Sequence, residues 1–266
     1  MGNSPLKILA WNVQGAGSSE FMNVLKEHIR LQHPSIIARM ETHIAGARAQ
    51  SVCDRIGFGR CFRVEAQGFQ GGIWVLWRPE EVKVNIIRHH EQYVTMEVRQ
   101  HRHHTWLLTV VYASPHVNLR ETLWIELLSF AQQCTHPWPV TGDFNDTISL
   151  DERNHGGPEM QRRCTRFKHW IENTGLIDLG YSGPKFTWSR GRDWSTIKKA
   201  RLDRALCNTA WRLKFQEGAV RHLMKAQSDH APILIATTGF VPLAQVTKPF
   251  RFQVAWTTHR DFEGVL

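Results

Sequence analysis

The sequence lacks the long hydrophobic runs that would place it in or across a membrane. Among its 266 residues, no stretch approaches the ~20 consecutive apolar residues of a membrane-spanning helix. The N-terminal segment has no basic region followed by a long apolar run, which argues against a secretory signal. Leu6 stands where a myristoylation signal needs Ser or Thr. We therefore expect no membrane partner and a nuclear or cytoplasmic location.

Cysteine is also scarce, and its spacing argues against a disulfide framework and against a structural zinc site. The five cysteines are an odd number, and none forms a C-x-x-C pair. Most of their neighbours are apolar or aromatic, so we expect buried, reduced thiols. They are Cys53, Cys61, Cys134, Cys164 and Cys207. Reduced thiols fit the cytosol or the nucleus.

The charge balance, by contrast, is strongly positive. The chain carries 33 Lys and Arg against 24 Asp and Glu, a formal net charge of +9 with His neutral. A basic surface favours polyanionic partners such as nucleic acid. Many basic proteins bind nothing in particular, so charge alone leaves both interpretations open.

Short strand-like segments are mixed with a few helical ones along the chain. Apolar residues at helical spacing predict helices at 21–31, 119–132 and 162–173. Predicted strands are 6–11, 35–40, 72–77, 82–87, 93–98, 105–112, 139–141, 185–188, 201–207 and 233–237. Helices interspersed with consecutive strands predict an α/β layered sandwich rather than a doubly wound sheet. We predict one domain over residues 1–239 and a tail over residues 240–266, where the alternation stops.

Polar side chains collect where the predicted strands end. Loops at strand ends are the usual place of catalytic groups, because a rigid sheet positions them. Carboxylates, amides and a histidine without softer ligands suit a hard cation such as Mg2+. Taken singly, each residue also has a structural explanation, such as a turn cap or an ion pair. The residues are Asn12, Glu41, Tyr112, Asp143, Asn145, Asp229 and His230, with Asp203 inside the strand 201–207.

Six short motifs containing these residues resemble those of the endonuclease/exonuclease/phosphatase superfamily over about residues 6–237. The motifs are Trp11-Asn12, Met40-Glu41-Thr42, Val111-Tyr112, Gly142-Asp143-Phe144-Asn145, Arg201-Leu202-Asp203-Arg204 and Ser228-Asp229-His230-x-Pro232. The connecting segments 71–77, 186–190 and 201–206 resemble the endonuclease domain of plant LINE-type (non-LTR) retrotransposon polyproteins. The tail resembles the linker from that domain towards a reverse transcriptase, which is absent here. We expect a stand-alone or truncated endonuclease portion.

The resemblance implies a fold and an activity. The fold is a four-layer α/β sandwich of two facing mixed β-sheets flanked by helices, with the active site at one rim. The activity is hydrolysis of DNA phosphodiester bonds by nicking, which leaves a 3′-hydroxyl and a 5′-phosphate. The cofactor is Mg2+, for which Mn2+ can substitute. DNA is the expected partner of a monomer, and no protein partner is predicted.

The same resemblance assigns roles at the metal end of the site. Glu41 is the expected direct Mg2+ ligand, with Asn12 adjacent to it. Asp229 would complete the set of metal-binding residues. Tyr112 would contact the phosphate or the leaving oxygen.

The remaining motif residues would act on the water and the phosphate. Asp143 would orient and deprotonate the attacking water, since a carboxylate is a suitable acceptor at neutral pH. Asn145 would hydrogen-bond the water or the scissile phosphate. His230, held by Asp203, would stabilise charge on the phosphate. Thr187 matches a position that contacts the DNA backbone or a displaced base in related nucleases.

Two positions depart from the family pattern. Pro115 stands where many DNA nucleases have an Asn, which removes a hydrogen bond on the phosphate side. Gln14 stands where repair enzymes often have an acidic residue, which favours general nicking over abasic-site repair. Two alternatives remain: a lipid or inositol phosphodiesterase of the same superfamily, and an inactive remnant that still binds nucleic acid.

Two further features attract a functional interpretation. The run from His101 to His104 lacks metal-ligand spacing, so we predict a solvated hairpin tip rather than a metal site. Trp194, near Lys198 and Lys199, is the best candidate for a base-stacking residue among the eleven tryptophans.

Overall fold

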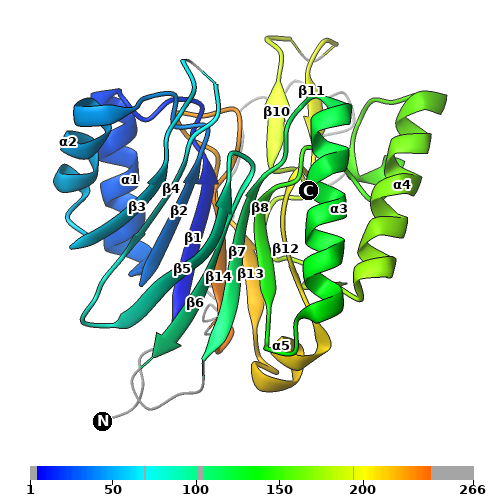
Figure 1. The fold of residues 1–266 in the computed structure, drawn as a ribbon. Helices are drawn as coiled ribbons and strands as arrows, with labels where there is room; N and C mark the ends of the chain where they lie inside the picture. The colour runs from blue at the N-terminus through cyan, green and yellow to red at the C-terminus, as the bar shows by residue number, and fades with distance from the viewer. Residues whose placement is uncertain (1–4, 69, 101–104, 194, 241–266) are drawn as a thin grey trace, which may run out of the picture.

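The computed structural model describes residues 5–68, 70–100, 105–193 and 195–240. Two six-stranded β-sheets lie face to face, and helices cover their outer faces (Figure 1). The predicted α/β sandwich of two mixed sheets flanked by helices is confirmed. The predictions for the His101–His104 run, for Trp194 and for residues 241–266 lie outside the described residues.

The first sheet contains the N-terminal strands and the last two strands of the chain. Its order is β13 (Ala219–His222), β14 (Ile233–Ala236), β1 (Lys7–Asn12), β2 (Ile36–Met40), β4 (Ile73–Trp77) and β3 (Arg60–Val64). Only the pairing of β1 with β2 is parallel within this described sheet. Helices α1 (Ser19–Gln32) and α2 (Gly46–Ile56) cover its outer face (Figure 1).

The second sheet contains the middle of the chain. Its order is β5 (Val82–His90), β6 (Tyr93–Gln100), β7 (Trp106–Tyr112), β8 (Pro139–Asp143), β12 (Asp203–Cys207) and β9 (Ile177–Asp178). The β7–β8 pairing is parallel and the others are antiparallel. Helices α3 (Val117–Gln133) and α4 (Pro158–Thr174) cover its outer face (Figure 1).

Three smaller elements complete the fold. A two-stranded hairpin, β10 (Trp188–Arg190) with β11 (Lys198–Ala200), projects beside the second sheet (Figure 1). The short helix α5 (Thr209–Lys214) connects β12 to β13, and the 3-10 turn η1 (Leu150–Glu152) connects β8 to α4. No helix in the described ranges is long and apolar enough to cross a membrane.

The apolar residues form three layers, as four stacked layers of structure require. One layer lies between the sheets and includes Ile8 and Ile36 from the first sheet and Val94 and Val110 from the second. The other two lie beneath α1 and α2 and beneath α3 and α4. Successive side chains of a strand point to opposite faces, so strands buried on both faces are apolar throughout. Strand β7, buried at all seven residues, is apolar apart from Thr109, whose hydroxyl is paired with that of Thr95.

Some expected elements differ from those observed. Residues 185–187 are not a strand; pairing begins at Trp188, and the Thr187 amide donates to the Ala200 carbonyl at 3.1 Å. Helix α2 was not predicted, although Ala49, Val52, Cys53 and Ile56 are buried at helical spacing. All five cysteines are free, and Cys61 and Cys134 are only partly buried.

Candidate active site

The candidate residues meet at one rim because of how the strands pair. Parallel β1 and β2 place Asn12 opposite Met40, so that Glu41 follows at the same edge. Parallel β7 and β8 place Tyr112 opposite Asp143. Antiparallel β12 then places Asp203 on the other side of Asp143. The segment that carries Asp229 and His230 reaches the same rim through a bridge between Trp188 and His230.

Gly142 allows β8 to approach β7 closely enough for this arrangement. Its φ is +137°, and a Cβ atom there would lie 2.0 Å from the carbonyl oxygen of Val111. A larger residue would push the two strands apart and separate Tyr112 from Asp143. Glu41 and Asn145 also have positive φ, +53° and +49°, which is uncommon for residues other than glycine. The backbone at this rim is therefore held in unusual conformations by its surroundings.

Asp203, His230 and Asp143 form a buried chain of close contacts. Nδ1 of His230 lies 2.8 Å from Oδ2 of Asp203, and its Nε2 lies 3.7 Å from Oδ2 of Asp143. All three side chains are almost fully buried. Asn12 Nδ2 donates to Asp143 Oδ2 at 2.8 Å, and the Asn145 amide donates to Asp143 Oδ1 at 2.8 Å. Both carboxylate oxygens of Asp143 are thus engaged on their protein side.

Charge and burial shift the pKa values of this chain. Burial alone would lower the pKa of His230, but the carboxylates of Asp203 and Asp143 raise it to about 10. Burial raises the pKa of Asp143 to about 7, and the neighbouring imidazolium of His230 opposes this rise. At neutral pH His230 is therefore charged, and Asp143 can take up or release a proton.

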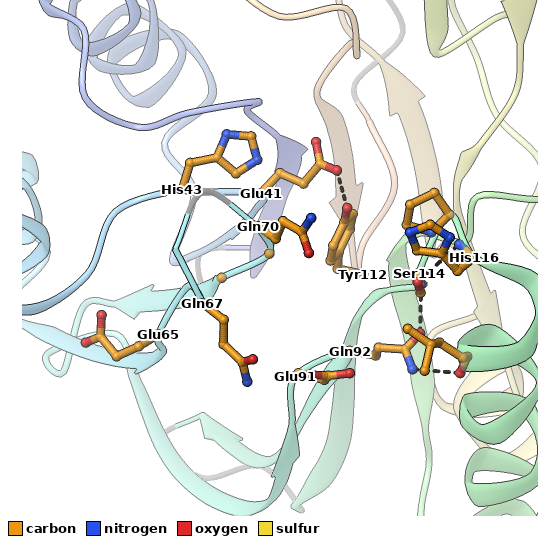
Figure 2. Close-up of a pocket in the computed structure, with 14 residues that line it drawn as sticks. Glu41, His43, Glu65, Gln67, Gln70, Glu91, Gln92, Tyr112, Ser114 and His116 are labelled. Carbon is orange, nitrogen blue, oxygen red and sulfur yellow. Dashed lines mark hydrogen bonds between the residues drawn. The ribbon is translucent and has the colours of Figure 1, made fainter.

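Glu41 and Asp229 contribute two more carboxylates to the rim. The Tyr112 hydroxyl donates to Glu41, and burial together with this carboxylate raises the pKa of Tyr112, which stays neutral (Figure 2). Gln14 and Trp188 donate to Asp229 Oδ2 at 3.0 and 2.9 Å. Asp229 Oδ1 is buried and accepts no hydrogen bond within the described part of the chain.

Two adjoining pockets open at the rim and share Glu41 and Pro115. The first is a cleft of about 410 Å³ that contains Asp143, Asn145, Asp229 and His230. Its wall carries the basic side chains of Arg153, His155, Arg163 and Arg190. The second pocket, of about 430 Å³, lies on the Tyr112 side of Glu41 and carries Glu65, Glu91 and three glutamines (Figure 2). The strongly basic wall therefore belongs to the cleft with the His230 chain.

Thr187 occupies a different kind of position from the other candidates. It is buried, and its Oγ1 accepts hydrogen bonds from the amides of Leu202 and Asp203, both at 3.0 Å. Its carbonyl accepts from the Ala231 amide, next to His230. Thr187 is not among the described residues that line the two pockets. Its contacts tie the Asp203 strand to the His230 segment.

Several residues of the site were not singled out from the sequence. Trp188 holds Asp229 and lines the cleft, and its place in the Phe-Thr-Trp motif was the available signal. Arg163 donates to the Asn145 carbonyl at 3.0 Å and forms an ion pair with Asp146 at 3.3 Å. Arg153 donates to the Thr147 hydroxyl at 3.0 Å. No local pattern marks these two arginines among the many basic residues of the chain.

Among the residues that the structure describes, one group of side chains is compact enough to surround a cation. Asp143, Asp203 and His230 each offer a ligand atom, and these atoms lie within 4.8 Å of one another. Nδ1 of His230 is already engaged by Asp203, however, and protonation of the ring removes its lone pairs. The carboxylates of Glu41 and Asp229 are the better donors for a hard cation, because Asp229 Oδ1 accepts no described hydrogen bond and lies 4.0 Å from Nε2 of His230.

The sequence profile described as "Endonuclease/Exonuclease/phosphatase family" matches residues 9–230. No curated protein matches the sequence.

Solved structures share the fold at low identity. The endonuclease domain of TRAS1, a telomere-specific non-LTR retrotransposon, is 15% identical with a TM-score of 0.64, over 88% of this chain and 98% of that one. The AP endonuclease LMAP from Leishmania major is 13% identical with a TM-score of 0.67, over 87% of each chain. The 3′-5′ exonuclease NExo from Neisseria meningitidis is 19% identical with a TM-score of 0.63, over 86% of this chain and 98% of that one.

Proposed function

The chain belongs to the endonuclease/exonuclease/phosphatase family, and on that premise we propose that it is a Mg2+-dependent endonuclease that nicks DNA. The observation that carries the proposal is an acidic, hydrogen-bonded centre set in a cleft with an arginine wall. Carboxylates suit a hard cation and an attacking water, whereas arginines suit phosphate oxygens. Such a cleft accommodates a phosphodiester between its two charged halves. The fold of the TRAS1 domain supports a retrotransposon-type activity, in which the freed 3′-hydroxyl primes reverse transcription.

Glu41, Asn12 and Asp229 are the proposed holders of Mg2+. Asp229 Oδ1 is a buried acceptor without a described donor, and Glu41 lines both pockets. The nitrogen of the Asn12 amide donates to Asp143, and its oxygen accepts from the Gln14 backbone amide at 3.2 Å, which leaves one lone pair of that oxygen for a cation. When bound there, the ion would neutralise charge on the phosphate as a Lewis acid. We expect Mn2+ to substitute, since it shares the preference for oxygen ligands.

Asp143 is the proposed general base. Its pKa of about 7 lets the carboxylate accept a proton from water at neutral pH. Asn12 and Asn145 fix the orientation of the carboxylate from two sides. The side-chain nitrogen of Asn145 donates to the Ala113 carbonyl at 2.8 Å, which leaves its oxygen to accept from the attacking water.

His230 and Tyr112 are the proposed donors to the phosphate. His230 is protonated, its Nδ1 is held by Asp203, and its Nε2 faces the cleft, where it can donate to a phosphate oxygen. The Tyr112 hydroxyl donates to Glu41 and can turn to the phosphate or the leaving oxygen when substrate binds. Thr187 would support this set by holding the backbone at Asp203, and the predicted DNA contact at Thr187 stays part of the proposal.

Nicking of a supercoiled plasmid tests the proposal. The protein should convert supercoiled plasmid to the open circle with Mg2+ or Mn2+ and leave it intact with a chelator. Asp143→Asn and His230→Gln should abolish nicking, whereas Glu27→Gln, an exposed carboxylate on α1, serves as the matched control. Ligase should reseal the nicks if the ends are 3′-hydroxyl and 5′-phosphate.

Other outcomes select the alternatives. A protein that binds plasmid and never nicks it is an inactive nucleic-acid-binding remnant. A protein that hydrolyses phosphoinositides or sphingolipids but not DNA is a lipid phosphodiesterase. Either result overturns the proposed nicking activity.

A further inference from the structure

Two thiols lie in contact beneath helix α2, on the side of the first sheet that faces the helices. Cys53 is on α2 and Cys61 is on the edge strand β3, and their Sγ atoms are 3.2 Å apart. Cys53 is buried, while Cys61 is partly exposed. Both are free thiols, and the Cys61 thiol donates to the Cys53 sulfur.

A buried guanidinium lies in the same layer. Arg39, on β2, has no exposed surface and stacks on the rings of Phe21 and Trp74, at 4.7 and 5.0 Å from their centroids. Its Nε, Nη1 and Nη2 atoms have no hydrogen-bond partner among the described residues. A buried charge without a partner is costly, and ring faces compensate only part of that cost. Since arginine does not lose its proton in proteins, a nearby anion is the way to balance it.

The thiols are the groups that can supply this anion. Burial lowers the pKa of Arg39, and Cys53 and Cys61 are the groups that oppose the effect. The hydrogen bond from Cys61 lowers the pKa of Cys53, and Arg63 on β3 and Arg39 on β2 add to this; the same pairing raises the pKa of Cys61. The Arg63 guanidinium is also paired with the carboxylate of Glu65 at 2.9 Å, whereas the side chains stacked on Arg39, Phe21 from α1 and Trp74 from β4, are uncharged.

We propose that Cys53 and Cys61 form a redox-modification site, in which Cys53 is the thiolate balanced by Arg39 and Arg63 and Cys61 is the resolving thiol. The oxidant is hydrogen peroxide. The Cys53 thiolate attacks one peroxide oxygen, the O–O bond breaks, and sulfenic acid and hydroxide form. The Cys61 sulfur then attacks the Cys53 sulfur, and the S–O bond breaks. The departing hydroxide takes the Cys61 proton and leaves as water, so that one peroxide accepts two electrons and one disulfide forms.

The chain contains its own matched controls for this reaction. Cys207 is buried without such a partner, and burial raises its pKa to about 11. Cys134 is partly exposed, and burial also raises its pKa. If access alone decided reactivity, Cys134 would react before Cys53. If the guanidinium groups decide it, Cys53 reacts first.

Peptide mapping of the native protein after limited hydrogen peroxide tests the proposal. Trypsin cleaves on both sides of each cysteine, so a disulfide would join peptide 49–55 to peptide 61–63. We expect this linked pair to form about tenfold or more faster than any modification of Cys134 or Cys207, because the thiolate is the reacting form and the surroundings lower the pKa of Cys53 but raise those of Cys134 and Cys207. A thiol reductant should release it. Equal or slower reaction at Cys53 overturns the proposal.

Variants test the charge and the order of the two thiols. Arg39→Met should slow the oxidation of Cys53 about tenfold and shift the rise of its rate to higher pH. Arg39→Lys keeps the positive charge, so the rate and its pH dependence should stay near those of the wild type. In Cys61→Ser, dimedone should trap a sulfenic acid on peptide 49–55. If the Met variant does not fold, the wild-type comparison with Cys134 still decides, and it does not depend on nuclease activity. An unchanged rate and pH dependence in folded Arg39→Met contradicts the role of Arg39.

Discussion

We expect the carboxylate of Asp203 to decide the charge state of His230. The two side chains meet at 2.8 Å and expose only 2% and 4% of their surface, so solvent screens their attraction little. Asp203→Asn keeps the size of the side chain and an oxygen that can accept from Nδ1, but it removes the negative charge. The substitution therefore separates the effect of charge from that of the hydrogen bond.

The magnitude follows from the distance. At an effective dielectric constant near 20, opposite unit charges about 4 Å apart attract by about 4 kcal/mol. This corresponds to a pKa change of about 3. The pKa of His230 should therefore fall from about 10 in the wild type to about 7 in the variant. Above neutral pH the variant would have a neutral imidazole facing the cleft.

Two measurements check this expectation. The rate of plasmid nicking at saturating Mg2+ should stay high to about pH 9 in the wild type and fall from about pH 7 in Asp203→Asn. Stability should follow the same group, because a raised pKa stabilises the fold fully below the unfolded pKa of about 6.5. That contribution is lost as the pH rises through about 10. The variant should therefore lose up to about 4 kcal/mol of unfolding free energy at about pH 6 and much less at about pH 10.5.

Glu27→Gln is the control for general effects of removing a carboxylate, because its side chain is exposed on α1. If the nicking rates of the wild type and Asp203→Asn fall at the same alkaline pH, the protonated imidazole of His230 is not the form needed for catalysis. If the loss of stability is the same at both pH values, the ion pair is not its cause.

Three further predictions concern other parts of the site. Glu41→Gln should raise the Mg2+ concentration for half-maximal nicking by about tenfold or more, because an amide replaces a carboxylate, and an unchanged titration would contradict Glu41 as a ligand. Gly142→Ala should prevent folding or lower the urea midpoint strongly, because its Cβ would lie 2.0 Å from the Val111 carbonyl; a wild-type midpoint would contradict this. Thr187→Val should cost about 1–3 kcal/mol of unfolding free energy for each amide left without an acceptor, whereas Thr187→Ser should cost much less. Equal urea midpoints for these two variants would exclude that role of the hydroxyl.

Much of the fold could be predicted from the sequence because most of the strands are buried. Strand β4 is apolar along its whole length and β7 is apolar apart from Thr109, and sheets covered on both faces need such strands. Helix α2 was missed because its apolar positions are filled partly by Ala and Cys among charged residues. The segment 185–187 was taken for a strand from its composition, but its backbone bonds to Ala200 and Ala231 as a connecting loop.

The candidate residues and the pairing of His230 with Asp203 could be expected from the motifs, but most of the other contacts could not. Nothing local to Thr187 shows that it holds the amides of Leu202 and Asp203. The contact of Trp188 with Asp229 joins segments 41 residues apart. The contact of Cys53 with Cys61 also depends on how α2 lies against an edge strand that was not predicted.

The sequence by itself determined most of the strands and helices, the residues that are candidates for catalysis, and the family resemblance. These features depend on local alternation of apolar and polar residues and on short motifs. Only the tertiary structure decided that Asp143 lies between Tyr112 and Asp203, and that His230 carries a proton. The physical reason is that sheet register and burial set the distances between charges, and those distances set the pKa values. Sheet register and burial both depend on many residues together, so no single position of the sequence specifies them.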